Sequence, residues 1–231
     1  MRPAVVVIAV SCLVIAAALA RQGAPVVDNA QAEDASEEGA VFGLDFIDET
    51  ASAIDGANPF ALMDQATISA DVEDANVRAF LLMIQHSEGT DQVSDPYACL
   101  YGYSGTITDF SDHPKLTGEW QGVSLANLGP SYAGKISTAA GAYQIIKPTW
   151  QGCKRALGLT DFGPASQDAA AIYLIREAGA LDYVKAGQFD AAVGLCAREW
   201  ASLPGANAAG QAMRRLDDLR TAYANAGGAI A

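Results

Sequence analysis

The feature that most limits how this chain can fold is a tract of 56 residues, 22–77, with 13 acidic side chains and no Lys, Arg or His. Its beginning, residues 28–40, is acidic, small and polar, which is typical of a solvated linker rather than a packed core. From Arg78 onward the chain carries 14 acidic and 12 basic side chains. The charge pattern therefore indicates that the compact part of the protein follows this tract.

The same charge distribution excludes two classes of protein. The near balance after residue 77 leaves no strongly basic face to follow phosphates, so we expect no nucleic-acid partner. Hydrophobic residues make up 51% of the chain, which excludes a wholly disordered protein. The length of 231 residues allows either one domain of ordinary size with an extension or two small domains.

A signal peptide or membrane anchor is predicted at residues 1–21. Arg2 and the amino terminus precede 17 uncharged residues, 4–20. This run falls between the length of a signal-peptide core and that of a spanning helix, and Ala18-Leu19-Ala20 fits a cleavage site. The segment is thus either removed near Ala20 or retained as an anchor in the inner membrane. Either alternative exports the rest of the chain, because the positive charges precede the run.

Residues 22–70 form the predicted linker. Apolar side chains interrupt its acidic composition, and they are Phe42, Leu44, Phe46, Ile47, Phe60, Leu62 and Met63. Short amphipathic helices that dock on the main domain would explain them, and so would a loose tether with adhesive patches. We favour the tether.

The remaining residues, 71–231, have the length of an ordinary domain. Val77, Phe80, Leu81 and Ile84 have the spacing of one buried helix face, with Asp71 as the expected N-cap.

Residues 97–135 are rich in Gly, Ser, Thr, Tyr and Pro, and predict loops with a small hairpin sheet. Further helices are expected over 139–146, 148–156, 166–178, 180–186, 189–201 and 211–224. The predicted fold class is α+β, a mainly helical domain with one small β lobe.

Glu88 is the residue on which the predicted chemistry depends. It lies four residues after Ile84 and seven after Leu81, so it extends the apolar face, and Gly89 suits a helix C-cap. Burial and the negative end of the helix dipole both disfavour the carboxylate and raise its pKa. A carboxyl group that stays protonated near neutral pH can act as a general acid. The alternative is a Glu that ends the helix and turns to solvent.

Cleavage of a glycosidic bond is a common task for such an acid, and it often uses a second carboxylate. The candidates are Asp91, Asp95, Asp109 and Asp112, and no spacing distinguishes one of them. Asp109 and Asp112 also fit a self-bonded Asp/Ser turn before Pro114.

We predict no metal or cofactor site. His86 and His113 are the only histidines, and neither forms a ligand-spaced set. No Gly-rich phosphate loop follows a strand. Cys99, Cys153 and Cys196 allow one disulfide, but we expect reduced, buried thiols.

Six segments in order resemble the phage lambda lysozyme family. They are SEGTD at 87–91, DFSDHP at 109–114, STAAGAYQII at 137–146, LGLTDF at 157–162, SQDA at 166–169 and WASLPG at 200–205. The resemblance covers roughly residues 77–228. It implies a lysozyme-like fold and a lytic transglycosylase that cleaves the MurNAc–GlcNAc β-1,4 bond of peptidoglycan, in a phage or prophage endolysin.

The resemblance also implies roles for single residues. The family residue that matches Glu88 is the only acid/base: it protonates the leaving oxygen and then deprotonates the muramoyl 6-hydroxyl, which closes a 1,6-anhydro ring. No second carboxylate is then required. The residues expected to contact or support the glycan are Gln144, Tyr143, Thr138, Asp109 and Tyr173. Trp150 is a candidate for stacking on sugars, whereas Trp200 is expected in the core.

The expected partner is the peptidoglycan glycan strand, bound by a monomer in the periplasm. Two alternatives stay open: a hydrolysing muramidase, and a virion-associated protein that binds or penetrates the cell wall. The intact Glu88 and Gln144 favour an enzyme.

Overall fold

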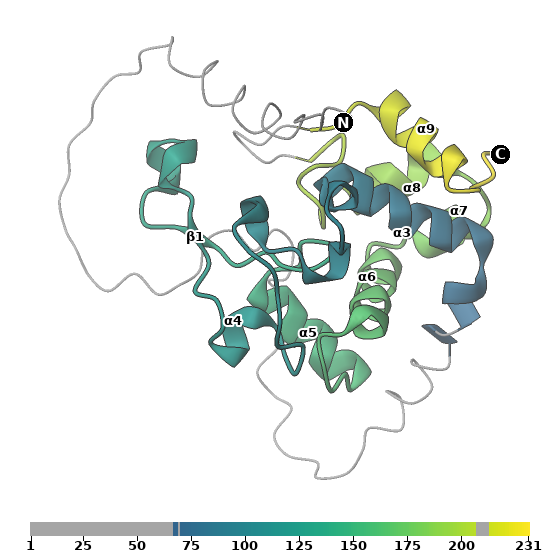
Figure 1. Ribbon diagram of the computed structural model, residues 1–231. Helices are drawn as coiled ribbons and strands as arrows, with labels where there is room; N and C mark the ends of the chain where they lie inside the picture. Colours follow the sequence, from purple (N-terminus) through teal and green to yellow (C-terminus); the bar gives the residue numbers. More distant parts are fainter. Residues whose placement is uncertain (1–66, 69, 207–212) are drawn as a thin grey trace, which may run out of the picture.

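The computed structural model describes residues 67, 68, 70–206 and 213–231 (Figure 1). The predicted segment at 1–21 and the apolar patches of the linker lie outside these residues. The linker's last residues are described, and 67, 68 and 70 are helical, directly before helical residues 71–73. No helix in the described ranges combines the length and apolar character needed to cross a membrane.

Helices form most of the domain, and α3 packs against α6, α7 and α9 (Figure 1). Their bounds are α3 Ala75–Glu88, α4 Pro114–Thr117, α5 Lys147–Leu157, α6 Pro164–Glu177, α7 Leu181–Lys185, α8 Phe189–Cys196 and α9 Leu216–Asn225. The apolar face predicted for α3 is confirmed, because Val77, Phe80 and Ile84 are fully buried. Phe80 packs edge-on against Phe189 of α8 and Tyr223 of α9.

The start of α3 differs from the prediction. Its N-cap is Asp74, whose carboxylate accepts from the backbone N–H groups of Asn76 and Val77 at 2.8 and 3.1 Å. Asp71 lies inside the preceding helical residues and is buried. Its carboxylate pairs with Lys185 at 2.5 Å and Arg176 at 3.3 Å. Asp71 therefore takes part in an ion-pair network and does not cap α3.

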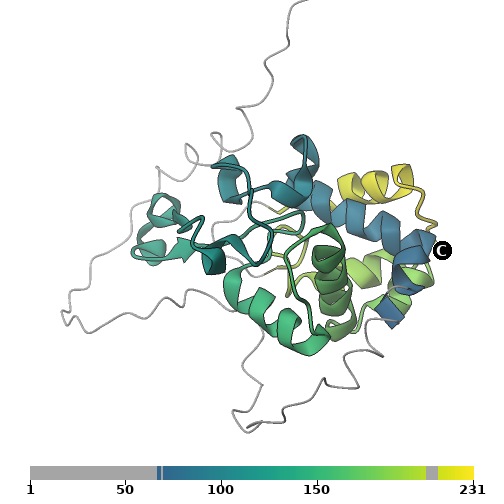
Figure 2. The same ribbon diagram turned by 60° about the horizontal axis from the view of Figure 1, so that its bottom comes forward.

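The predicted β lobe is confirmed as a small irregular unit beside the helices (Figure 2). Strand β1, Val123–Ser124, pairs antiparallel with β2, Ile136–Ser137. Short 3-10 turns fill the rest of the lobe and its approach: η1 Thr90–Gln92, η2 Pro96–Ala98, η3 Tyr101–Tyr103, η4 Ala126–Leu128 and η5 Pro130–Tyr132.

The helix predicted over 139–146 is wrong. These residues form a tight turn closed by a β-bridge between Ala140 and Ile145. Gly141 and Gln144 have φ angles of 76° and 49°, which a right-handed helix cannot contain. The side chain of Gln167 fills the space beside Gly141, where a Cβ atom would lie 2.1 Å from its Oε1.

The bounds of α5, α6 and α7 agree with the predicted helices to within two residues, whereas α8 ends five residues before the predicted end at 201 and α9 begins at Leu216, five residues after the predicted start. α5 ends at Gly158 in the left-handed conformation, as expected for a C-cap. α6 begins at Pro164, two residues before the predicted Ser166 cap, because Pro at the first helical position needs no N–H partner. α8 ends at Cys196, where the chain turns so that Trp200 donates to the Tyr143 carbonyl.

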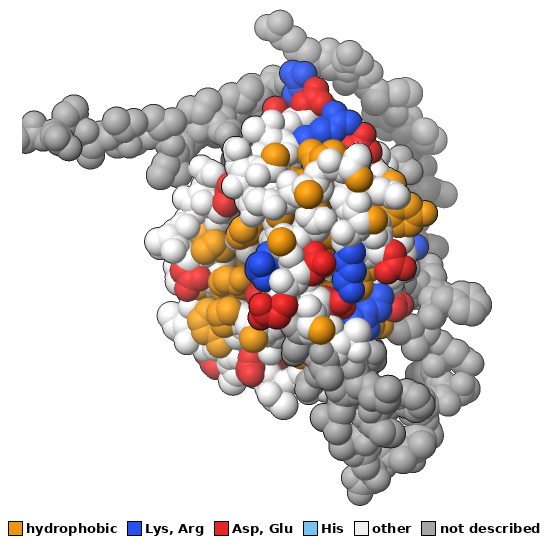
Figure 3. Space-filling model, turned by 90° about the vertical axis from the view of Figure 1, so that its right-hand side faces the viewer, with side chains coloured by type: hydrophobic (Ala, Val, Ile, Leu, Met, Phe, Trp, Pro, Cys, Tyr) orange, Lys and Arg blue, Asp and Glu red, His pale blue; other side chains and the backbone are white. Residues whose placement is uncertain are grey.

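Charged side chains on the face shown in Figure 3 are of mixed sign. This is the side of the molecule where α7 and α9 lie in Figure 1. Acidic and basic groups alternate there with hydrophobic and neutral ones, as the balanced charge after residue 77 leads one to expect. Cys99, Cys153 and Cys196 are free and buried, which confirms the expectation of reduced thiols for the described cysteines.

His113 joins the β lobe to the turn at 139–146. It is fully buried, and its Nε2 lies 3.1 Å from the Ile145 carbonyl oxygen. Its Nδ1 accepts from the Lys115 N–H at 3.2 Å, which assigns the proton to Nε2. The ring also packs edge-on against Phe162. Burial lowers the pKa of His113 from 6.5 to about 4.

We expect His113 to make the fold sensitive to acid. The unfolded chain binds a proton near pH 6.5 and the folded chain only near pH 4, so stability is full above 6.5 and falls as the pH drops through this window. Protonation of His113 should lower the free energy of unfolding by about 3 kcal/mol across this window. Urea unfolding of the wild type and His113→Gln between pH 4 and 7 measures it. The variant should lose less stability on acidification, and an equal loss in both proteins would contradict the assignment.

Candidate active site

Glu88 is the last residue of α3, at the end of its apolar face. Gly89 follows with φ of 77°, and its N–H returns to the carbonyl groups of Gln85 and His86. The helix therefore stops directly after Glu88, as the sequence predicts, and its negative end lies at the carboxyl group. Glu88 is itself only partly exposed to solvent.

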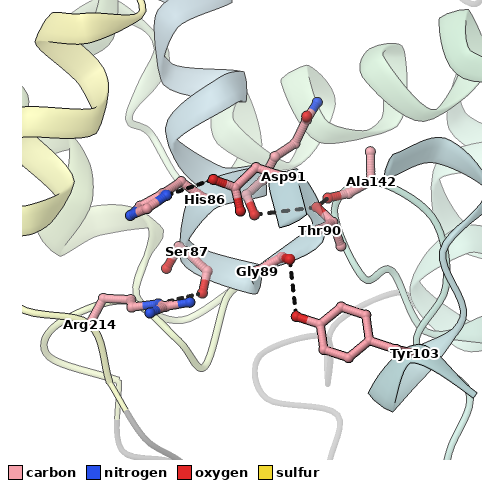
Figure 4. A network of polar contacts seen from close by, with 9 residues as sticks. His86, Ser87, Gly89, Thr90, Asp91, Tyr103, Ala142 and Arg214 are labelled. Atoms are coloured by element: carbon pink, nitrogen blue, oxygen red, sulfur yellow. Dashed lines mark hydrogen bonds and ion pairs between the residues drawn. The ribbon is translucent and has the colours of Figure 1, made fainter. Parts of the chain in front are cut away.

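Two serine hydroxyls connect Glu88 to a distant part of the chain. Ser202 Oγ donates to Glu88 Oε1 at 2.6 Å, and Ser87 Oγ donates to Ser202 Oγ at 2.8 Å. Arg214 holds both serines through their backbones. Its backbone N–H donates to the Ser202 carbonyl at 2.9 Å. Its side-chain Nε donates to the Ser87 carbonyl at 3.2 Å (Figure 4). The carboxyl group is thus fixed in orientation.

The surroundings of Glu88 raise its pKa from 4.5 to about 7. Removal from water is the largest cause, because it disfavours the charged form. The hydrogen bond from Ser202 and the positive charge of Arg214 act in the opposite direction. The pKa is raised as the sequence predicts, and the group can release or take up a proton near neutral pH.

The turn after Glu88 is held from two sides (Figure 4). Tyr103 Oη donates to the Gly89 carbonyl at 3.0 Å, and Thr90 Oγ1 donates to the Ala142 carbonyl at 2.6 Å. The Thr90 bond ties the end of α3 to the turn at 139–146.

The four candidate second carboxylates each have partners of their own. Asp91 Oδ2 lies 2.7 Å from His86 Nδ1, and Asp95 accepts from the Tyr97 N–H at 3.0 Å. Asp109 accepts from the Ser111 N–H at 2.9 Å, which is the self-bonded turn weighed as its alternative.

Asp112, the fourth candidate, accepts from Trp150 Nε1 at 2.7 Å and pairs with Lys154 at 2.6 Å. Within the described residues, the hydrogen bonds of these four aspartates lead to neither Glu88 nor Ser202.

Among the predicted glycan contacts, Gln144 and Thr138 are partly exposed and Asp109 is exposed. Gln144 Nε2 donates to the Gly141 carbonyl at 3.0 Å, within its own turn. Thr138 Oγ1 accepts from the N–H of Lys147, the first residue of α5. Tyr173 is partly buried on α6 and packs against the core.

The structure contradicts two of the predicted contacts. Tyr143 is buried, and its hydroxyl donates to Asp168 Oδ1 at 2.5 Å, so its side chain supports the turn from inside. Trp150 is also fully buried, edge-on against Phe162 at 4.7 Å between ring centroids. Neither ring presents a face to a glycan. Trp200 lies in the core, as expected.

Ser202 and Arg214 are site residues that no spacing in the sequence predicts. Ser202 lies inside the WASLPG segment at 200–205, which carried the resemblance but received no role, so its motif was the available signal. Arg214 lies outside every motif. Within the described ranges, no group of three or more His, Cys, Asp or Glu side chains is arranged to hold a metal ion.

Comparison with known proteins shows which family this chain belongs to. The sequence model of the Endolysin family matches residues 78–230. The endolysin of Escherichia phage P2 is 39% identical over 157 residues, which cover 66% of this chain and 93% of the relative. The endolysin of Escherichia phage lambda is 38% identical over 158 residues, which cover 66% and 92%.

Two solved structures share the fold. Bacteriophage lambda lysozyme complexed with a chitohexasaccharide is similar with a TM-score of 0.59 and 37% identity, over 68% of this chain and 97% of that one. A second structure of lysozyme from bacteriophage lambda gives a TM-score of 0.56 and 34% identity, over the same shares. The chain therefore belongs to the endolysin family, as a lysozyme-like enzyme of the phage lambda type.

Proposed function

We propose that this endolysin is a lytic transglycosylase that cleaves the MurNAc–GlcNAc β-1,4 bond of peptidoglycan and leaves 1,6-anhydromuramoyl ends, for lysis of the host. The observation that carries the proposal is Glu88, a carboxyl group with a pKa of about 7 whose hydrogen bond leads to a serine instead of a second carboxylate. The chitohexasaccharide in the complex of lambda lysozyme supports a glycan substrate.

In the first step, Glu88 acts as the acid. Ser202 donates to Oε1, so the carboxyl proton belongs on Oε2. That proton passes to the glycosidic oxygen, the bond from this oxygen to C1 of MurNAc breaks, and GlcNAc leaves with a hydroxyl group at C4.

In the second step, the Glu88 carboxylate acts as the base. It takes the proton from the C6 hydroxyl of MurNAc while that oxygen bonds to C1, which closes the anhydro ring. Ser202 can donate to Oε1 in both steps, since a neutral carbonyl oxygen and a carboxylate oxygen both accept. The charge of Arg214 favours the carboxylate form that the second step needs.

A hydrolysing muramidase is the main alternative. It would need a second carboxylate to activate water or to form a covalent intermediate. The partners of Asp91, Asp95, Asp109 and Asp112 favour the reaction with a single acid/base.

We also propose export to the periplasm through residues 4–20, either with removal near Ala20 or with retention in the inner membrane. Amino-terminal sequencing of the mature protein distinguishes these two routes. A full-length protein confined to the cytosol would exclude both, and recovery from purified phage particles would favour the virion-associated alternative.

The products should lack one water relative to those of hydrolysis. Mass spectrometry of sacculi digested by the full chain should show anhydromuramoyl ends, because the internal 6-hydroxyl replaces water as the nucleophile. Products with ordinary reducing ends, one water heavier, would establish a muramidase instead.

Glu88→Gln should abolish lysis and stabilise the fold. The raised pKa means that ionised Glu88 opposes folding: stability is full below pH 4.5 and falls as the pH rises through about 7. Gln removes that cost, so at pH 8 the variant should be more stable by on the order of 1–3 kcal/mol. Lysis assays and urea unfolding test the two effects, and either retained lysis or lower stability at pH 8 would refute the assignment.

Ser202→Ala should shift the pH dependence of lysis. Its hydroxyl lowers the pKa of Glu88, so its loss should move the fall of activity at high pH further upward. Activity at pH 7 should drop about tenfold, because the carboxyl group loses its fixed orientation. Ser202→Thr, which retains a hydroxyl, and Ser124→Ala in β1 are the controls. A pH profile with an unchanged midpoint would contradict this role.

A further inference from the structure

Tyr103 has an unusual backbone conformation. Its φ is 57°, and apart from Gln144 it is the only non-glycine residue in the described ranges with positive φ. Gly102 before it has φ of 65°, so two consecutive residues are left-handed. A bulky side chain disfavours this region, and such strain persists where the surroundings enforce it, often at functional sites.

Packing into the core does not account for this strain. Tyr103 is 47% exposed and lies outside the hydrophobic core and the side chains that pack against it. The conformation lets Tyr103 Oη donate a hydrogen bond to the Gly89 carbonyl. The strained turn therefore delivers an aromatic ring to the residue that directly follows Glu88.

The absence of a side chain at Gly89 leaves space for Tyr103 at the end of α3. A Cβ atom on Gly89 would lie 2.5 Å from Tyr103 Oη and 3.6 Å from Arg214 Nη2. Tyr103 and Arg214 thus approach Gly89 closely, from the η3 turn and from the segment before α9 (Figure 4). The glycine provides both the left-handed turn and the space that they need.

The exposed part of Tyr103 has the chemical properties of a side chain that packs against a sugar ring. Its hydroxyl is directed to the Gly89 carbonyl, and Tyr103 is 47% exposed, so its exposed part meets solvent beside the residue that follows Glu88. The faces of aromatic rings carry partial negative charge and attract the weakly positive C–H groups of a pyranose. A tyrosine also offers rigid contact area at little cost in conformational entropy.

We propose that Tyr103 is a glycan-binding residue, whose ring packs against the sugar next to the bond that Glu88 cleaves. The inference rests on the proposed function, since it takes the substrate to be a glycan strand. It replaces the two aromatic contacts that the sequence assigned to Tyr143 and Trp150, both of which are buried.

Binding of chitohexaose to the full chain tests the proposal. Glu88→Gln serves as the parent, so that no turnover occurs, and calorimetry compares it with the added changes Tyr103→Gly, Tyr103→Phe and Tyr183→Ala. Tyr183 is the matched control, a tyrosine 41% exposed on α7. We expect Tyr103→Gly to weaken binding about fivefold to tenfold. Tyr103→Phe should retain most of the affinity, and Tyr183→Ala all of it.

Thermal unfolding separates a binding role from a structural one. Tyr103→Gly should unfold at or above the temperature of the parent, since relief of the left-handed strain offsets the lost hydroxyl bond.

Unchanged affinity in Tyr103→Gly would overturn the proposal, and so would an equal loss in Tyr103→Phe, which would assign the effect to the hydroxyl. No binding by the parent would also overturn it. Because none of these measurements needs cleavage, failure here leaves the product assay of the proposed function intact.

Discussion

The hydrogen bond between Ser202 and Glu88 is the interaction on which the rest of the domain depends. It joins side chains 114 residues apart, one at the end of α3 and the other in the turn between α8 and α9. For it to form, α3 must stop at Gly89 and α8 must stop at Cys196. The chain must also return at Arg214 to hold the Ser202 carbonyl. Each of these features is local, but together they place one oxygen atom.

The turn at 139–146 supports the same point from the opposite side. Thr90 fastens it to the end of α3, and Gln167 of α6 accepts from the Ala142 N–H at 2.8 Å. Asp168, next along α6, accepts from the hydroxyls of Tyr143 and Tyr97. The bonds of Thr90 and Gln167 are buried and those of Asp168 are partly buried, and their polar groups are satisfied, so the network holds the turn in one arrangement. Rigidity of this kind matters for an acid that must act on a single bond.

Local signals explain what the sequence could predict. The spacing of Val77, Phe80 and Ile84 and the glycine after Glu88 define α3 and its end without knowledge of the rest of the chain. The turn at 139–146 was mistaken for a helix because Gly141 is favoured there by the Gln167 side chain, a contact across 26 residues. The side chains of Tyr143 and Trp150 differ from the prediction for a related reason, since a motif does not say whether an aromatic ring faces the core or the surface. The hydrogen bond of Ser202 is long-range, and no spacing could reveal it.

The buried thiols have a consequence for how the domain stays folded. Cys99, Cys153 and Cys196 are unpaired, and burial raises the pKa of Cys153 and Cys196 to about 12, so their reactive thiolate forms are scarce. Apolar packing and hydrogen bonds account for the described fold without a covalent cross-link. Within the described residues, the domain therefore keeps its packing without a disulfide among Cys99, Cys153 and Cys196, and burial makes these three thiols slow to react with an oxidant.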